Sequence, residues 1–429
     1  MKRLLGALGP GILLAATSVG ASHILLSPEA GARFGVDLVW LIVLVHVIKY
    51  PAFAFAPRYV AAQNESLLDA YAHVPGPRNW AVWLGLGDMA LQAIGLIAAL
   101  VGLTASFLVV AVGGPSLTVW SLLLTAVLLV LLRWGRYRSL RLVNLVLMLS
   151  LVLGTVIAFT AAPPSLDMVP QMLTPSFPAG SLLLVAAILG FMPTSVGVSI
   201  WQSLWALEHR RLRPDNADKL ERLRNGLLDV RLGYGLSVLL AVLFVSLGAV
   251  LLAPRGLVPE GPEVALTLSR LYTLVLGDWM QPVFLAMAFC ALFTTCYTMM
   301  DGFPRSFIAA LRVLRGDSAV SSEPHGAPLL GRPYWVFLLS TTFLGMAILA
   351  LAPDPALLVK IVGAFGLLLS PVYYALNLWA VTRRIEDPRL RPDGVIVTVA
   401  MAGIVFMVLI AGLLLWTTWV EATSASLPT

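Results

Sequence analysis

Residues 190–197, GFMPTSVG, interrupt a long apolar segment near its middle, and residues 20–23, GASH, do the same in another. Proline removes a backbone N–H donor and clashes with the preceding turn, and glycine loosens a helix further. Two such interruptions, five apolar segments apart, are typical of transporters built from two inverted repeats, whose unwound helix centres form the binding site. We therefore expect broken helices near residues 19–23 and 191–196. Two ordinary kinks are the alternative.

The composition places these segments in a membrane. Of the 429 residues, 59% are hydrophobic and 12% are charged, whereas soluble domains carry about 25% charged residues. A bilayer is spanned by about 20 apolar residues. The sequence predicts eleven transmembrane helices, near 9–33, 36–57, 80–110, 116–133, 142–162, 179–207, 232–253, 276–302, 334–352, 357–381 and 395–418. The first is expected to be a retained helix and not a signal peptide, because no clear cleavage site follows it.

Basic residues predict the orientation of these helices. Of the 28 Lys and Arg residues, 23 fall in segments on one side of the predicted membrane, seven of them within 209–231, and four fall on the other. Basic residues concentrate in cytoplasmic loops. We expect a multi-pass protein of the inner (plasma) membrane, with a cytoplasmic N-terminus and an external C-terminus. The basic run 209–231 is then a cytoplasmic loop, so no nucleic-acid partner is expected.

No soluble catalytic signature is present in the sequence. It contains neither a phosphate-binding glycine loop nor a helical H-E-x-x-H motif. We therefore predict that the chain is not an enzyme and uses no cofactor. Its predicted partners are a small inorganic or organic solute and the lipid bilayer, and the oligomeric state stays open.

Several motifs resemble the Nramp divalent-metal transporters. Gly9-Pro10-Gly11 followed by the first interruption and by AGARFG at 30–35 is similar to the first span of that family. Met192-Pro193 stands where the family has Met-Pro-His, MDGF at 300–303 resembles Met-Glu-Gly-Phe, and Ser370-Pro371 resembles Leu-Pro. The resemblance covers essentially the whole chain.

The resemblance implies an all-α integral membrane protein with the LeuT-type fold. That fold has two inverted five-helix repeats plus one further helix, with helices 1 and 6 broken at the midplane. The expected division is 1–162 for the first repeat, 163–385 for the second, and 386–429 for the last helix and C-terminus, all within one transmembrane domain.

The family's metal ligands are mostly replaced in this chain. Gly20 and His23 stand where Nramp proteins place metal-binding Asp and Asn, and Thr194 stands where they place a histidine. Ser199 corresponds to a second family histidine and Leu369 to a glutamine of the site. The resemblance therefore implies a divergent branch that keeps the fold and lacks most of the metal ligands.

The loss of the acidic ligand changes the expected substrate. A divalent cation needs oxygen or nitrogen ligands and usually a compensating negative charge, but the remaining candidates, Met192, His23 and Thr194, are not anionic. The N-termini of the half-helices after each break favour negative charge. We expect a secondary transporter whose solute is a small anion, such as bicarbonate or a carboxylate, or else a polar molecule. Coupling of this transport to protons or to another ion is left open. A metal transporter with a rearranged site and a non-transporting membrane receptor or regulatory protein are the alternatives.

The predicted solute site comprises residues at both breaks. They are Gly20, Ala21, Ser22, His23, Met192, Thr194 and Ser195. His23 is an intramembrane group that can titrate near neutral pH and is a coupling candidate, or else a hydrogen-bonded structural imidazole.

Four other ionisable residues are interpreted from their positions in the predicted spans. Asp88, one residue from the family's proton-pathway position, is either a coupling carboxylate or a residue at the cytoplasmic mouth. Glu29 is a third coupling candidate, or a vestibule or helix-start charge. Lys49 is expected to extend its ammonium to the inner interface, and Asp301 is expected to pair with Arg305 one turn on.

Overall fold

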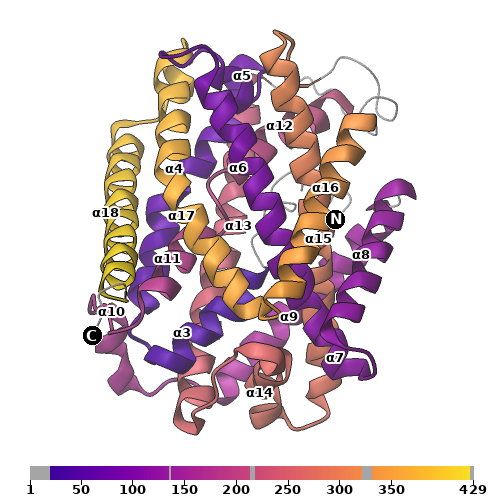
Figure 1. The fold of residues 1–429 in the computed structure, drawn as a ribbon. Helices are drawn as coiled ribbons and strands as arrows, with labels where there is room; N and C mark the ends of the chain where they lie inside the picture. Colours follow the sequence, from indigo (N-terminus) through magenta and orange to yellow (C-terminus); the bar gives the residue numbers. More distant parts are fainter. Residues whose placement is uncertain (1–19, 135–136, 213–217, 321–330, 426–429) are drawn as a thin grey trace.

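The computed structural model describes residues 20–134, 137–212, 218–320 and 331–425, and the statements below concern those residues. Their regular structure is helical, and most helices run along one common direction (Figure 1). In chain order the elements are η1 Ser22–Leu26, α3 Ser27–Phe34, α4 Val39–Gln63, α5 Leu67–Tyr71, α6 Trp80–Leu96, η2 Ile97–Val101, α7 Gly102–Val112, α8 Leu117–Trp134, α9 Tyr137–Ala161, η3 Leu166–Met168, α10 Val169–Leu173, α11 Leu182–Phe191, α12 Val198–Leu212, α13 Lys219–Leu247, η4 Gly248–Leu252, η5 Ala253–Arg255, η6 Gly261–Glu263, α14 Val264–Leu276, α15 Met280–Leu314, α16 Arg332–Leu351, α17 Pro355–Trp379, η7 Ala380–Arg384, η8 Pro388–Leu390 and α18 Gly394–Ala425.

Within the described part of the chain, eight helices are long and apolar enough to cross a membrane, or nine if the pair 149–161 and 166–173, bent by 108°, counts as one span. The first predicted span is described only from Gly20, and the sixth is present as two shorter helices. The membrane character is confirmed, whereas the number eleven stays a prediction.

The break in the sixth span is confirmed. Helix α11 ends at Phe191 and α12 begins at Val198, and the intervening segment includes a cis Met192–Pro193 peptide bond. Helix α11 lies against α17 so closely that a Cβ on Gly190 would sit 1.8 Å from the Gly363 carbonyl oxygen. The absence of a side chain at Gly190 therefore allows the contact that fixes the end of the half-helix. The other predicted break lies at the edge of the described residues, which start at Gly20.

The helices after the two interruptions pack crosswise. Helix α3 packs on α13 and η4, and α12 packs on α4. At the first contact a Cβ on Gly31 would lie 2.1 Å from the Val245 carbonyl oxygen, and a Cβ on Gly248 would lie 2.4 Å from the Pro28 carbonyl oxygen. Each of these helices therefore packs against a helix of the other predicted repeat, as expected of two inverted repeats. The residue limits of the repeats stay a prediction.

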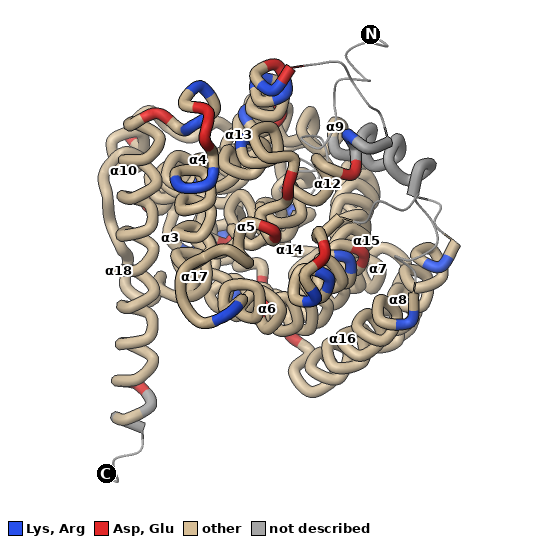
Figure 2. Tube along the Cα trace, turned by 90° about the horizontal axis from the view of Figure 1, so that it is seen from above, with Lys and Arg blue, Asp and Glu red and all other residues tan. Residues whose placement is uncertain are grey.

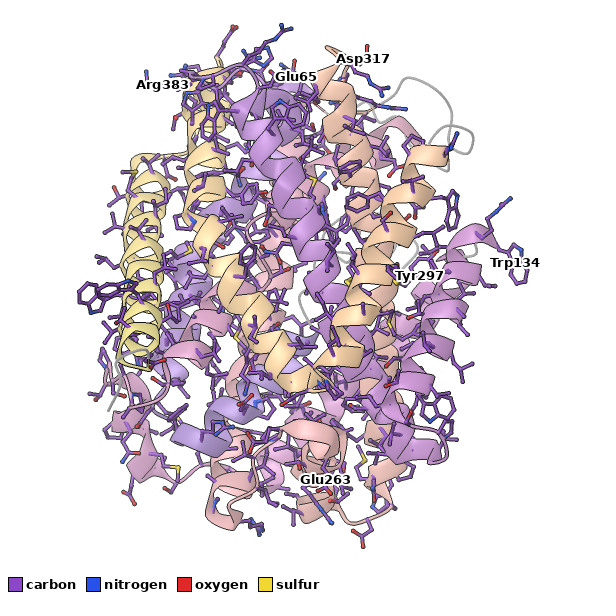
Figure 3. The ribbon with its side chains drawn as sticks, viewed as in Figure 1. Glu65, Trp134, Glu263, Tyr297, Asp317 and Arg383 are labelled. Atoms are coloured by element: carbon purple, nitrogen blue, oxygen red, sulfur yellow. The ribbon has the colours of Figure 1, made fainter. Side chains whose placement is uncertain are left out.

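Charged residues gather at the ends of the bundle. Viewed along the helices, Lys, Arg, Asp and Glu take up short stretches while most of the chain is tan (Figure 2). Figure 3 shows Glu65, Asp317 and Arg383 at one end and Glu263 at the other. These four lie on the sides that the loop assignment predicts, and which end faces the cytoplasm stays a prediction.

Candidate functional site

A cavity of about 90 Å³ lies where the two interrupted spans meet α6, α15 and α17. Its walls are largely apolar, with aromatic and thioether side chains among them. The lining residues are Gly20, Ala21, Ser22, Asp88, Met89, Gln92, Leu96, Leu100, Phe191, Pro193, Thr194, Ser195, Gly197, Val198, Ile200, Trp201, Thr295, Met299, Phe303 and Tyr373.

The cavity brings together most of the predicted site residues. Gly20, Ala21, Ser22, Thr194 and Ser195 all line it, and so does Asp88. The backbone explains this meeting, because residues 192–197 are free of helical geometry and can curve around a solute. The role of these residues in binding stays a prediction.

His23 and Met192 are not part of the lining, although both are fully buried. The imidazole of His23 faces α13, where its Nε2 lies 2.9 Å from the Ser237 Oγ and 3.1 Å from the Ser237 carbonyl oxygen. Its Nδ1 lies 3.0 Å from the Ser22 Oγ. His23 therefore belongs to a hydrogen-bonded cluster between helices, which favours its structural interpretation.

His46 completes this cluster. Its Nε2 lies 2.8 Å from the Ser237 Oγ, and its Nδ1 lies 2.7 Å from the Ile42 carbonyl oxygen. One proton assignment fits these four contacts with both rings neutral. The Ser22 hydroxyl donates to His23 Nδ1, His23 Nε2–H donates to Ser237, the Ser237 hydroxyl donates to His46 Nε2, and His46 Nδ1–H donates to Ile42.

Asp88 has different surroundings on α6. It is 6% exposed, and its Oδ2 accepts a hydrogen bond of 2.8 Å from the Tyr373 hydroxyl. Among the described residues, its Oδ1 has no hydrogen-bond partner by distance and angle, and neither has the Oε1 of Gln92, one helical turn later, whose side chain lies close to the carboxylate. Asp88 is thus buried and lines the cavity, and the choice between its two interpretations stays a prediction.

The prediction for Lys49 is wrong. Its side chain is fully buried, and its ammonium donates to the carbonyl oxygens of Leu189 at 3.0 Å, Gly190 at 3.2 Å and Thr194 at 2.7 Å. Pro193 has no N–H to offer the Leu189 carbonyl, so the helix break leaves an acceptor that the lysine satisfies. The cation also lies at the C-terminal end of α11, where the helix dipole favours it. Lys49 thus supports the break instead of reaching the interface.

Glu29 lies outside the cavity. It is 1% exposed, and its Oε1 accepts from Arg33 Nε at 2.9 Å and from Lys360 Nζ at 2.7 Å. This ion-paired cluster joins α3 to α17. The predicted pair of Asp301 and Arg305 is confirmed at 2.7 Å.

Sequence reasoning missed Gln92 and Tyr373 as cavity residues. Gln92 could have been found, because it lies four residues after Asp88 and therefore on the same helix face. Tyr373 comes from α17, distant in sequence, and no local pattern indicates its contact with Asp88.

Three comparisons bear on the family. A family model described as "Natural resistance-associated macrophage protein-like" matches residues 11–417. The chain is 28% identical over 389 residues to the uncharacterized protein PM0681 of Pasteurella multocida, covering 87% of this chain and 84% of that protein. It is 24% identical over 254 residues to the divalent metal cation transporter MntH of Chromohalobacter salexigens, covering 58% of this chain and 57% of that protein.

Solved structures agree in fold. A manganese transporter of Eremococcus coleocola superposes with a TM-score of 0.73 at 15% identity, over 100% of this chain and 89% of that one. MhsT, solved in complex with L-phenylalanine, superposes with a TM-score of 0.62 at 13% identity, over 94% of this chain and 98% of that one. Identities this low carry the fold alone. From the match over nearly its whole length, the chain belongs to the Nramp family, and it has the LeuT-type fold of membrane transporters.

Proposed function

We propose that this chain is a secondary transporter that carries a small polar solute through the cavity by alternating access, and that the solute is not a transition metal ion. Transporters with two inverted repeats bind substrate between their discontinuous helices. The cavity lies against residues 20–22 of the first interrupted span and against 193–195 of the second. A solute bound there would contact both repeats, which alternating access requires.

The observation behind this proposal is the small set of possible metal ligands that line the cavity. Among the described residues that line it, Asp88 is the one carboxylate, and no imidazole or thiol joins it. The described chain also holds no group of three or more His, Cys, Asp or Glu side chains able to bind a metal. A transition metal ion would have to exchange its hydration shell for one carboxylate, neutral oxygens and thioethers, which offsets the dehydration poorly.

Asp88 also favours one of the two solute classes that the sequence left open. An anion in this cavity would lie beside a carboxylate with an unpartnered oxygen, in a medium of low dielectric constant where like charges repel strongly. The N-terminus of α12 at Val198 attracts an anion, but it carries only a partial charge and lies beside Asp88, since a Cβ on Gly197 would sit 3.6 Å from Asp88 Oδ2. The geometry therefore supports a polar solute over bicarbonate or a carboxylate.

A metal substrate is the second candidate, because specific atoms favour it. Asp88 Oδ1 and Gln92 Oε1 are unpartnered oxygens, and Met89 and Met299 line the same cavity. The relatives that carry a functional name are divalent metal cation transporters. A rearranged site of this composition is the form that a metal transporter would have to take in this chain.

Uptake by the purified full chain in liposomes separates these candidates. Manganese entry is followed by quenching of an enclosed dye, and entry of radiolabelled small amines, amides, alcohols and carboxylates is followed in parallel. We expect saturable entry of a polar organic solute, and manganese entry equal to that of empty liposomes. Saturable manganese uptake that Asp88→Asn abolishes contradicts the proposal and supports the metal candidate.

A further inference from the structure

Two acceptor atoms in the cavity lack the donors that buried oxygens ordinarily have. Asp88 Oδ1 and Gln92 Oε1 accept no hydrogen bond from the described residues by distance and angle, although the Gln92 side chain lies close to the Asp88 carboxylate, and the two residues are 6% and 3% exposed. More than nine in ten buried polar groups in proteins have a hydrogen-bond partner, and an unpartnered one costs about 1–3 kcal/mol, more if charged. Two lie on one face of α6, both on residues that line the same cavity, and they offer acceptors to the donors of a bound solute or of water.

The protein does not neutralise Asp88 by itself. In the described parts of the chain, no Lys or Arg pairs with this carboxylate. The Lys49 side chain, buried at the nearby helix break, donates hydrogen bonds to three main-chain carbonyl oxygens, and Lys49 does not line the cavity. The Tyr373 hydroxyl occupies Oδ2 and leaves Oδ1 available.

Part of the cavity lining is aromatic. Trp201 and Phe303 line the cavity with ring centroids 4.7 Å apart in an edge-to-face arrangement, and Phe191 lines it as well. Aromatic faces attract organic cations and also bury apolar carbon. They do not coordinate a small inorganic cation, which needs oxygen ligands on every side.

We infer that the cavity binds an organic ammonium, whose N–H groups donate to the Asp88 carboxylate and the Gln92 side chain and whose short apolar body packs against Phe191, Trp201 and Phe303. This inference rests on the proposed function and names its substrate class. A volume of about 90 Å³ accommodates several water-sized groups, since a single water needs on the order of 10–15 Å³ on this measure. The body is therefore small, of roughly the size of a butyl or phenyl group.

A matched series of probes tests this inference on the purified full chain by titration calorimetry. Isobutylammonium, isobutanol and isobutyrate share one apolar body and differ in the charge of the head group, and methylammonium and benzylammonium vary the body. We expect isobutylammonium to bind at least tenfold more tightly than either isostere. Asp88→Asn should weaken it at least tenfold and Gln92→Leu about threefold, while Asp387→Asn, the same change in an exposed loop, leaves it unchanged.

Each other outcome counts against the inference in a distinguishable way. Equal binding of isobutanol, or tighter binding of isobutyrate, overturns the ammonium class while leaving a non-metal transporter in place. Binding of manganese that Asp88→Asn removes, with no ammonium bound, overturns both the inference and the proposed function. No binding by any of the three ammonium probes to a chain that elutes as a single folded species also overturns the inference.

Discussion

Two buried polar clusters lie close to the helix breaks, and they differ in how their hydrogen bonds are satisfied. In the first, His23, His46 and Ser237 close a chain of hydrogen bonds from Ser22 to the Ile42 carbonyl oxygen. In the second, Asp88 and Gln92 each keep an unpartnered oxygen at the cavity. The difference teaches that a buried ionisable residue is not by itself a substrate site. Asp88 and Gln92 are candidate binding groups because they line the cavity, whereas His23 and His46 do not.

The largest effect is expected at Lys49, which belongs with the satisfied groups. Lys49→Met leaves the carbonyl oxygens of Leu189, Gly190 and Thr194 without their donor. At about 1–3 kcal/mol for each buried unpartnered group, the variant should lose about 3 kcal/mol or more of stability. Thermal unfolding in detergent measures this loss.

Lys360→Met is the matched control for Lys49→Met. Lys360 also donates from a buried position, but Glu29 keeps Arg33 as a partner when the lysine is removed. Its melting temperature should fall less than that of Lys49→Met. An equal fall in melting temperature in both variants shows that the contacts of Lys49 with the three carbonyl oxygens stabilise the protein no more than the ion pair of Lys360 does.

Asp88→Asn should separate binding from stability. We expect ligand affinity to fall ten- to a hundredfold, about 1.4–2.7 kcal/mol, because the amide cannot balance a cationic head group. The unliganded protein should melt at the same temperature or higher, since an unpartnered buried carboxylate is removed. A variant that binds normally but melts early places Asp88 with the structural cluster.

Ser237→Ala should behave in the opposite way. The change removes the hydroxyl between His23 and His46, so His46 Nε2 loses its partner at a cost of about 1–2 kcal/mol. Affinity for the cavity ligand should stay within twofold of the unsubstituted protein, and the pH dependence of binding should not change. A pH dependence of uptake that this variant shifts returns the histidines to the transport mechanism.

The smallest effect is expected at Asp387, whose hydrogen bonds to Arg389 lower its pKa from the ordinary value. A lowered carboxyl pKa stabilises the folded state above the unfolded pKa, and this contribution disappears as the pH falls through the folded pKa. Because the pair is exposed to solvent, screening makes it small. Asp387→Asn should leave the melting temperature at pH 7 within the error of the measurement.

The sequence predicted the parts of the fold that local chemistry dictates. Pro193 and Gly190 indicate the break in the sixth span, since one lacks an N–H and the other lacks a side chain, and α11 does end at Phe191. Apolar length indicated a membrane protein, and spacing along one helix indicated the pair of Asp301 and Arg305. Each of these depends on neighbours within a few residues.

The candidate site was predicted in outline, because its composition depends on helix rotation and distant contacts. Successive residues of a helix point about 100° apart, so Ser22 lines the cavity while His23 faces α13. Lys49 was misplaced because its three acceptors belong to α11 and to the break that follows it, 140 residues or more away in sequence. No pattern within span 2 indicates them.

Anomalous X-ray scattering from crystals soaked separately with 3-bromopropylammonium and with manganese tests the central claim most directly. The account predicts a bromine peak beside Phe191 and Trp201, with the ammonium of the same molecule within hydrogen-bonding distance of Asp88 Oδ1, and no manganese peak in the cavity. A manganese peak at coordination distance from Asp88, with no bromine in the cavity, contradicts it.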